Sequence, residues 1–162
     1  MTLTIEELLD REMIRDVLAD YAVSMDLAPD TTATALVNAF HPDGVMITTD
    51  GHVYSGRAEI EGYVEGLTKK RAGGPEVYAR HWKFPCRFSF PRPGHADTVT
   101  YTLVLTEKGL DQVCTHRDHL VKEEGRWYIK ERRISIEYLT ADSRLDLPTM
   151  VVLNRHSPAP AQ

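Results

Sequence analysis

Residues 4–27 read TIEELLDREMIRDVLADYAVSMDL, and they predict the long helix around which the rest of the chain is arranged. Thr4 and Glu7 form a Thr-x-x-Glu capping box, which satisfies free backbone N–H groups at a helix start. Apolar residues then recur at steps of three and four, while charged residues fill most of the opposite face, as in an amphipathic helix. The apolar stripe consists of Ile5, Leu8, Leu9, Ile14, Val17, Leu18, Tyr21, Ala22 and Met25.

The last turn of this helix carries a charge that the helix itself does not need. Asp26 follows Tyr21 by five residues, which places it about 140° further around the helix at ~100° per residue. A carboxylate at a helix C-terminus opposes the helix dipole. Asp26 is therefore either simply solvated or present for a reason other than helix stability.

Length, composition and charge restrict the class of protein. A chain of 162 residues with 42% hydrophobic and 27% charged residues is typical of one globular domain. A net charge of −5 argues against nucleic acid as a partner, because phosphate binding requires a basic face. We find no apolar run of the roughly twenty residues that a membrane span needs, and no signal-peptide pattern. We therefore expect a cytoplasmic protein in which Cys86 and Cys114 are reduced thiols.

The remaining patterns are helical first and extended later. A second helix over residues 33–40 precedes a strand over 45–49, which returns through an Asp50-Gly51 hairpin into a third helix near residue 56. Four antiparallel strands follow, and Pro85 interrupts the first of them. These strands are expected over residues 77–90, 98–106, 111–122 and 127–138.

Helices followed by strands indicate the α+β class. We expect one cone-shaped domain over residues 1–139, in which three N-terminal helices pack on a strongly curved, mainly antiparallel sheet around a small-molecule pocket. Residues 140–162 are expected to form a C-terminal extension, either a lid or a dimer arm, followed by a disordered tail.

Several short motifs, in this order over residues 4–139, carry a family resemblance. They are Ile14-Arg-Asp-Val-Leu-Ala-Asp-Tyr21 ending in Asp26, Phe40-His-Pro-Asp-Gly44, Ser55-Gly-Arg-Ala-Glu-Ile60, His81 in the first long strand, and Asp118-His-Leu-Val-Lys122 continuing to Gly125-Arg-Trp127. With them the chain resembles the SnoaL-like branch of the nuclear transport factor 2-like superfamily. This fold hosts many unrelated activities, so the resemblance specifies the fold better than the function.

The resemblance implies an Asp–His dyad, as in similar dehydratases, dehydrochlorinases and isomerases. Asp26 and His81 match its positions, and Tyr21 matches a tyrosine of similar dehydratases; the sequence departs from many relatives at residues 82–85, Trp-Lys-Phe-Pro. A neutral imidazole in an apolar cavity is a base, and a carboxylate on its far nitrogen fixes the tautomer and stabilises the imidazolium. The alternative is a surface aspartate and a structural histidine, with Tyr21 as a core residue.

A second polar group lies in the strand over residues 111–122. A period of two places His116 and Asp118 on one face and His119 on the other. The candidate substrate-binding residues are His116, Asp118, Tyr101 and Trp82; the alternative for the strand is an exposed polar face with cross-strand pairs. The seven histidines show no metal-ligand spacing, and glycine-rich nucleotide motifs are absent, so we expect neither a metal nor a cofactor.

Together these observations favour a cofactor-independent lyase or isomerase, dehydratase-like, acting on a small and largely apolar molecule such as a polyketide, steroid-like or terpene-like compound. His81 would be the general base and acid, Asp26 would orient it, and Tyr21 with His116 or Asp118 would stabilise the developing oxyanion or leaving group. Two alternatives stay open: a non-catalytic ligand-binding or assembly module, and a small subunit of a ring-hydroxylating oxygenase, which shares this fold. The resemblance also implies a homodimer or higher homo-oligomer through the open face of the sheet.

Overall fold

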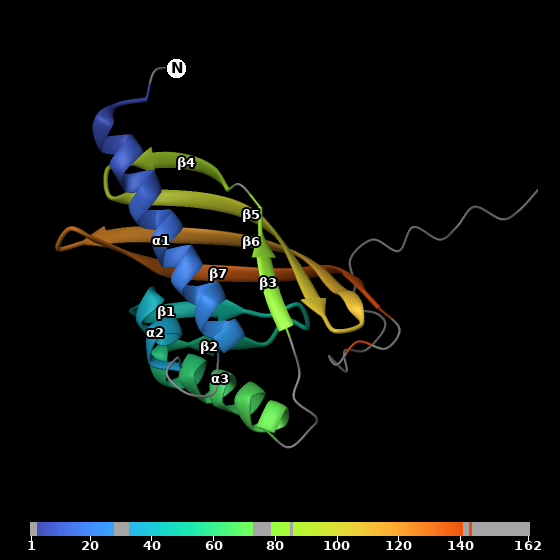
Figure 1. Cartoon of the computed structure of the whole chain (residues 1–162). Helices are drawn as coiled ribbons and strands as arrows, with labels where there is room; N and C mark the ends of the chain where they lie inside the picture. Colours follow the sequence, from blue (N-terminus) through green and yellow to red (C-terminus); the bar gives the residue numbers. More distant parts are fainter. Residues whose placement is uncertain (1–2, 28–32, 73–78, 85, 141–142, 144–162) are drawn as a thin grey trace, which may run out of the picture.

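The computed structural model describes residues 3–27, 33–72, 79–84, 86–140 and 143. Within this part of the chain there are three helices and seven strands (Figure 1). The helices are α1 (Ile5–Leu27), α2 (Ala33–Ala39) and α3 (Gly56–Ala72). The strands are β1 (Phe40–Ile47), β2 (Val53–Ser55), β3 (Ala79–Lys83), β4 (Arg87–Arg92), β5 (His95–Thr106), β6 (Gly109–Glu123) and β7 (Arg126–Leu139). None of the described helices combines the length and apolar composition that crossing a membrane requires.

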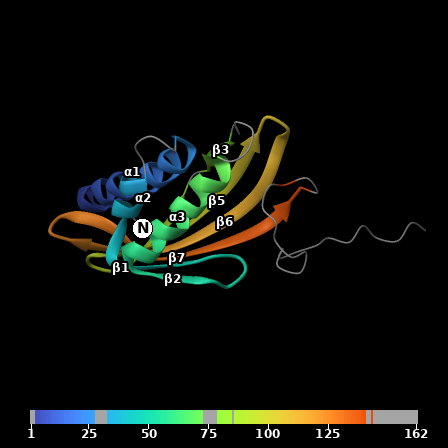
Figure 2. The same cartoon turned by 90° about the horizontal axis from the view of Figure 1, so that it is seen from below.

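The strands form one curved sheet in the order β2-β1-β7-β6-β5-β3, with β4 also paired to β5. All neighbours are antiparallel except β1 and β7, which are parallel. Helix α1 runs diagonally across the sheet, whereas α2 and α3 lie at one end beside β1 and β2 (Figures 1 and 2). The predicted α+β class, with three helices on a curved and mainly antiparallel sheet, is confirmed. Most of residues 140–162 lie outside the described residues, so the expected C-terminal extension stays a prediction.

The predicted long strand over residues 77–90 is wrong, because the chain forms two strands there. Both β3 and β4 pair with the same edge of β5: β3 pairs with its second half and β4 with its first half. Pro85, which lacks a backbone N–H and suits strand ends, lies between them in the sequence. The consequence for the site is that β3 is a short edge strand at the place where α1 ends.

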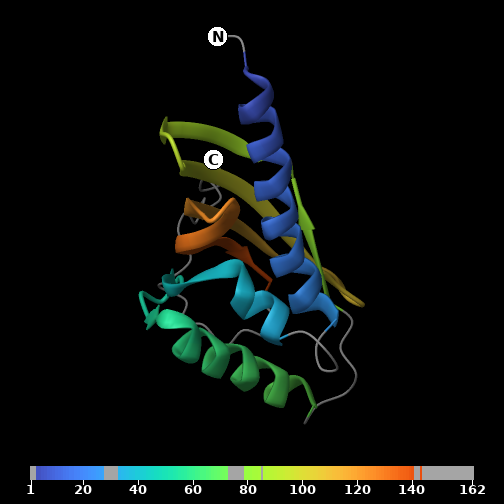
Figure 3. The ribbon, with the colours of Figure 1, turned by 90° about the vertical axis from the view of Figure 1, so that its left-hand side faces the viewer.

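Helix α1 begins as predicted but is buried over only part of its length. The Thr4 backbone N–H donates to Glu7 Oε2 at 2.8 Å, and the Glu7 N–H donates to Thr4 Oγ1 at 3.1 Å, which confirms the capping box. Ile5 and Leu9 are 79% and 61% exposed, because the first turns extend beyond the sheet (Figure 3). The buried part of the stripe is Ile14, Leu18, Tyr21, Ala22 and Met25. The C-terminal half of α1 is therefore the half that the sheet encloses.

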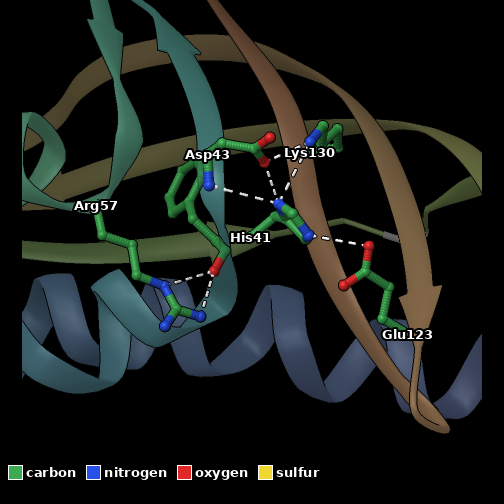
Figure 4. Close-up of polar contacts among 6 residues, drawn as sticks. His41, Asp43, Arg57, Glu123 and Lys130 are labelled. Atoms are coloured by element: carbon green, nitrogen blue, oxygen red, sulfur yellow. Dashed lines mark hydrogen bonds and ion pairs between the residues drawn. The ribbon is translucent and has the colours of Figure 1, made fainter.

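The parallel seam between β1 and β7 contains a bulge that the sequence did not indicate. Phe40 pairs with Ile129 and Val45 with Glu131, so β1 accommodates additional residues between these pairs. Figure 4 shows the side chains that hold this bulge: Arg57 donates to the Phe40 carbonyl oxygen from Nε and Nη2, at 2.9 and 2.7 Å. The same view shows a polar network in which His41 and Asp43 of β1 contact Lys130 of β7 and Glu123 at the end of β6. The predicted strand over 45–49 thus begins earlier, at Phe40.

Gly44 is the residue of this bulge that tolerates no side chain. A Cβ atom built on it would lie 2.9 Å from the carbonyl oxygens of both His41 and Ile129. We expect Gly44→Ala to lower the free energy of unfolding by about 1–3 kcal/mol, because these backbone atoms belong to the seam and can give way only by opening it.

Gly62 supplies a matched control. It lies within α3, and a Cβ atom on it would have nothing within 4 Å. Gly62→Ala is therefore expected to raise the stability by roughly 0.5–1 kcal/mol, since alanine is the better helix former. Urea unfolding followed by circular dichroism compares the two variants, and equal effects of both substitutions would contradict the role of the bulge.

Candidate active site

The end of α1 and the edge strand β3 meet through one carboxylate and one imidazole. His81 Nδ1 lies 2.6 Å from Asp26 Oδ1, and the two side chains are only 13% and 11% exposed. An ionised carboxylate has no hydrogen to donate, so the hydrogen of this bond must be on Nδ1. The neutral ring then carries its lone pair on Nε2, which is the arrangement of a base oriented by a carboxylate.

Asp26 also accepts a hydrogen bond from the backbone of β3. The His81 N–H donates to Asp26 Oδ1 at 3.1 Å and to Oδ2 at 3.0 Å. A free N–H at a sheet edge needs a partner, and this carboxylate supplies one. Arg80 Nη1 in turn lies 3.5 Å from the backbone oxygen of Asp26, close to the negative end of the α1 dipole. Asp26 is therefore a bridge between a helix and a strand, and its unfavourable position relative to the dipole is offset by these contacts.

The second polar group lies deeper, on the inner face of β6 and β7. Arg132 Nε and Nη2 donate to Asp118 Oδ1 and Oδ2 at 2.6 and 2.9 Å, and both side chains are 0% exposed. The guanidinium of Arg132 lies 4.0 Å from the ring centroid of Tyr21, and the imidazole of His116 lies 6.3 Å from it, edge to face. The structure thus brings Tyr21, His116 and Asp118 together, and it adds Arg132, which sequence reasoning missed.

The buried position keeps two of these groups uncharged. Burial raises the pKa of the Tyr21 phenol, although the charge of Arg132 opposes the shift, so the hydroxyl keeps its proton and can donate it in a hydrogen bond. Burial, followed by the positive charges of Lys83 and Arg132, lowers the pKa of His116 well below its usual value. His116 is consequently a neutral imidazole at physiological pH.

Lys83 is the second residue that the sequence reasoning did not select. It follows His81 by two residues on β3, so both side chains lie on the same face of the strand. Its Nζ lies 3.4 Å from His116 Nδ1 and 5.3 Å from the centre of the Tyr21 ring. Burial, and then the charge of Arg132, lowers the pKa of Lys83 to about 7.

The structure does not bring Trp82 and Tyr101 to this group. Trp82 alternates with the inward-facing His81 and Lys83, and Tyr101 alternates with the buried Thr100 and Thr102. Their side chains are 60% and 57% exposed, on the opposite face of the sheet. In the described part of the chain, no three His, Cys, Asp or Glu side chains converge in a way that would hold a metal ion.

A curved sheet around a helix, with an Asp–His pair where the helix meets the edge strand, defines an α+β protein of the nuclear transport factor 2-like superfamily. The model of the SnoaL-like domain matches residues 6–133, so the chain belongs to the SnoaL-like family, which binds small-molecule ligands. The resemblance seen in the sequence motifs is confirmed.

Solved structures with the same fold include three with descriptive names. A putative scytalone dehydratase from Novosphingobium aromaticivorans superposes with a TM-score of 0.71 at 19% identity, over 85% of this chain and 91% of that chain. A hexachlorocyclohexane dehydrochlorinase (LinA) type 2 superposes with a TM-score of 0.72 at 15% identity, over 90% of this chain and 98% of that chain. ActVI-ORFA from Streptomyces coelicolor superposes with a TM-score of 0.67 at 20% identity, over 80% of this chain and 96% of that chain. Identities this low establish a shared fold, and no curated protein matches the sequence.

The buried Asp118–Arg132 pair predicts a characteristic stability pattern. Arg132→Met should lower the free energy of unfolding by about 3–5 kcal/mol, because it leaves the Asp118 carboxylate buried without its counter-charge. Replacing both residues, Asp118→Leu with Arg132→Met, should recover most of this loss, since no buried charge then lacks a partner.

The neighbouring Arg133 provides the control for this experiment. Its side chain is 57% exposed and pairs with Glu131, so Arg133→Met should change the stability by roughly 0.5 kcal/mol or less. All three variants are compared by urea unfolding. If the double variant is as unstable as Arg132→Met alone, the pair is not the source of the loss.

Proposed function

We propose that the protein is a cofactor-independent lyase or isomerase in which His81 is the general base and acid and Asp26 holds its tautomer. The observation that carries the proposal is the 2.6 Å contact between His81 Nδ1 and Asp26 Oδ1, with both side chains largely withdrawn from solvent. A surface aspartate and a purely structural histidine would not require this combination of geometry and burial. The same pair leaves Nε2 as the basic nitrogen.

The proposed reaction begins with removal of a proton from carbon. His81 Nε2 takes a proton from the carbon next to a carbonyl group, and the electron pair moves toward the carbonyl oxygen. Asp26 stabilises the imidazolium that forms. In an elimination, the electron pair then returns and expels a hydroxide or halide from the next carbon. In an isomerisation, it instead accepts a proton at another carbon, and the imidazolium supplies that proton.

Stabilisation of the developing oxyanion falls to the deeper polar group. Tyr21 has a protonated phenol, and Arg132 Nη1 is a buried N–H that has no hydrogen-bond partner among the described residues. Both are donors of the kind that stabilises negative charge in a site shielded from water. Asp118 contributes indirectly, since both of its oxygens are occupied by Arg132. His116 is a neutral third contact for the substrate.

The names of the structural relatives are consistent with an elimination or isomerisation. Two of them are named for removal of water and of hydrogen chloride, a dehydratase and a dehydrochlorinase. We propose a small, largely apolar substrate of the polyketide, steroid-like or terpene-like kind. A small structural subunit would instead be expected to fill its interior with Trp82 and Phe84, but these side chains are 60% and 44% exposed.

We also propose that two copies associate through the outer face of the sheet. This face carries exposed aromatic and apolar side chains, which is unusual for a surface that stays in water. They are Trp82, Tyr101, Leu110 and Tyr138. Association there would leave the Asp26–His81 pair, on the inner face, accessible to substrate.

The test is a screen of hydroxylated polyketide, steroid-like and terpene-like compounds for turnover. Against a compound that is turned over, His81→Ala should lower kcat by roughly 10²–10⁴-fold, because general acid–base catalysis is lost. Asp26→Asn should also lower it, since an amide cannot stabilise the imidazolium as a carboxylate does.

The matched control is a second His–Asp pair in the same protein. His119 Nδ1 lies 2.7 Å from Asp97 Oδ1, but both side chains are considerably exposed. His119→Ala should leave turnover unchanged. Equal turnover by wild type and His81→Ala would remove His81 from the mechanism, and compounds that bind without turnover would favour the ligand-binding module.

A further inference from the structure

Lys83 is a partly buried lysine whose surroundings are not those of an ordinary surface lysine. Its Nζ approaches a neutral imidazole, His116 Nδ1, at 3.4 Å and the face of Tyr21 at 5.3 Å. Among the residues that the structure describes, no carboxylate forms an ion pair with it. The charge of Asp118 favours the protonated amine, but both of its oxygens already accept hydrogen bonds from Arg132. Burial and the charge of Arg132 therefore outweigh the effect of Asp118 on the amine.

The charge balance of the interior favours the uncharged form of Lys83. Arg132 is always protonated, so a second cation beside it is disfavoured. Burial and this charge bring the pKa of Lys83 to about 7, which leaves about half of the amine unprotonated at neutral pH. A lysine that is desolvated beside another cation is a nucleophile toward carbonyl carbon.

We propose that Lys83 Nζ forms an imine with an aldehyde or ketone substrate, whose α-carbon then lies next to His81. The inference rests on the proposed function, because it uses His81 as the base. Residues two apart on a strand are separated by roughly 6–7 Å and point to the same side. Long side chains at such positions can reach two adjacent carbons of one small molecule.

The chemical step balances without a further reactant. The amine lone pair attacks the carbonyl carbon, a C–N bond forms, and a proton moves from nitrogen to oxygen. The same oxygen then takes a second proton from solvent and leaves as water while the C=N bond forms, which gives a positively charged iminium. His116 lies within reach of Nζ and can carry the proton from nitrogen to oxygen.

A second observation, the hydroxyl of Thr102, supports a position next to Lys83 for the substrate oxygen that leaves as water. Thr102 pairs with Lys83 across the strands β3 and β5, and its buried Oγ1 has no hydrogen-bond partner among the described residues. Buried hydroxyls without a partner are uncommon in proteins and call for an explanation. A ligand oxygen next to Lys83 would satisfy this hydroxyl.

The imine would make proton removal by His81 easier. The iminium withdraws electrons from the α-carbon, and proton transfer to His81 Nε2 gives a neutral enamine. Because Arg132 is close by, loss of the iminium charge is favourable. The enamine then expels a β-hydroxide or accepts a proton at another carbon, and water restores the free amine and the product.

The experiment is reductive trapping with hexanal and sodium cyanoborohydride at neutral pH, with the modified lysines identified by peptide mass spectrometry. Lys83 should be alkylated at least about tenfold faster than Lys130, a surface lysine that pairs with Asp43. The preference for Lys83 over surface lysines should be large near pH 7 and should decline toward pH 10, where surface lysines also lose their proton. Modification of Lys83 no faster than that of Lys130 would overturn the proposal.

Two variants separate this proposal from the proposed function. His81→Ala should keep the fast labelling of Lys83 while it loses turnover, because imine formation does not need His81. Lys83→Arg should lose the fast label, and its fold is checked by urea unfolding. If Lys83 labels slowly while His81→Ala abolishes turnover, the imine is excluded and the Asp–His mechanism stands; the opposite result excludes His81 and retains the imine.

Discussion

The site depends on the hydrogen bonds that the Asp26 carboxylate accepts from His81. Asp26 belongs to the last turn of α1, yet it accepts hydrogen bonds from both the backbone N–H and the imidazole of His81 on the edge strand β3. One side chain thus fixes the position of a strand, the orientation of a ring and the tautomer of that ring. A carboxylate that opposes the helix dipole costs some stability, but the strand and the imidazole compensate for that cost.

The interior next to the Asp26–His81 dyad contains a buried ion pair surrounded by uncharged polar groups. Asp118 and Arg132 neutralise each other with two hydrogen bonds, and the groups around them, Tyr21 and His116, are uncharged. The effective dielectric constant of such a region is low, so a few fixed dipoles interact strongly with any charge that develops there. Lys83 lies between this region and the dyad, and the pKa of its amine is lowered to about 7. The arrangement brings an Asp–His pair, a protonated phenol and an amine together on the inner side of the sheet.

Local features of the fold could be predicted from the sequence, whereas features that depend on distant residues could not. The Thr4–Glu7 cap involves residues three apart, and the strand alternation needs only a period of two. The parallel pairing of β1 with β7 joins residues almost 90 positions apart and leaves no local signal. Arg132 lies in the run Lys130-Glu131-Arg132-Arg133, which resembles an exposed charged strand, and only its pairing with Asp118 explains its burial. Trp82 is a predicted substrate-binding residue that lies on the opposite face, as its position one residue after His81 on the strand indicates.

The tautomer of His81 tests the central claim most directly. Long-range proton–nitrogen NMR correlations of the His81 ring, recorded in mildly alkaline solution, distinguish a protonated Nδ1 from a protonated Nε2. The structure predicts a hydrogen on Nδ1 and a bare Nε2 in the wild type, and loss of that preference in Asp26→Asn. A wild-type ring protonated on Nε2, or one unchanged by the substitution, would contradict the account.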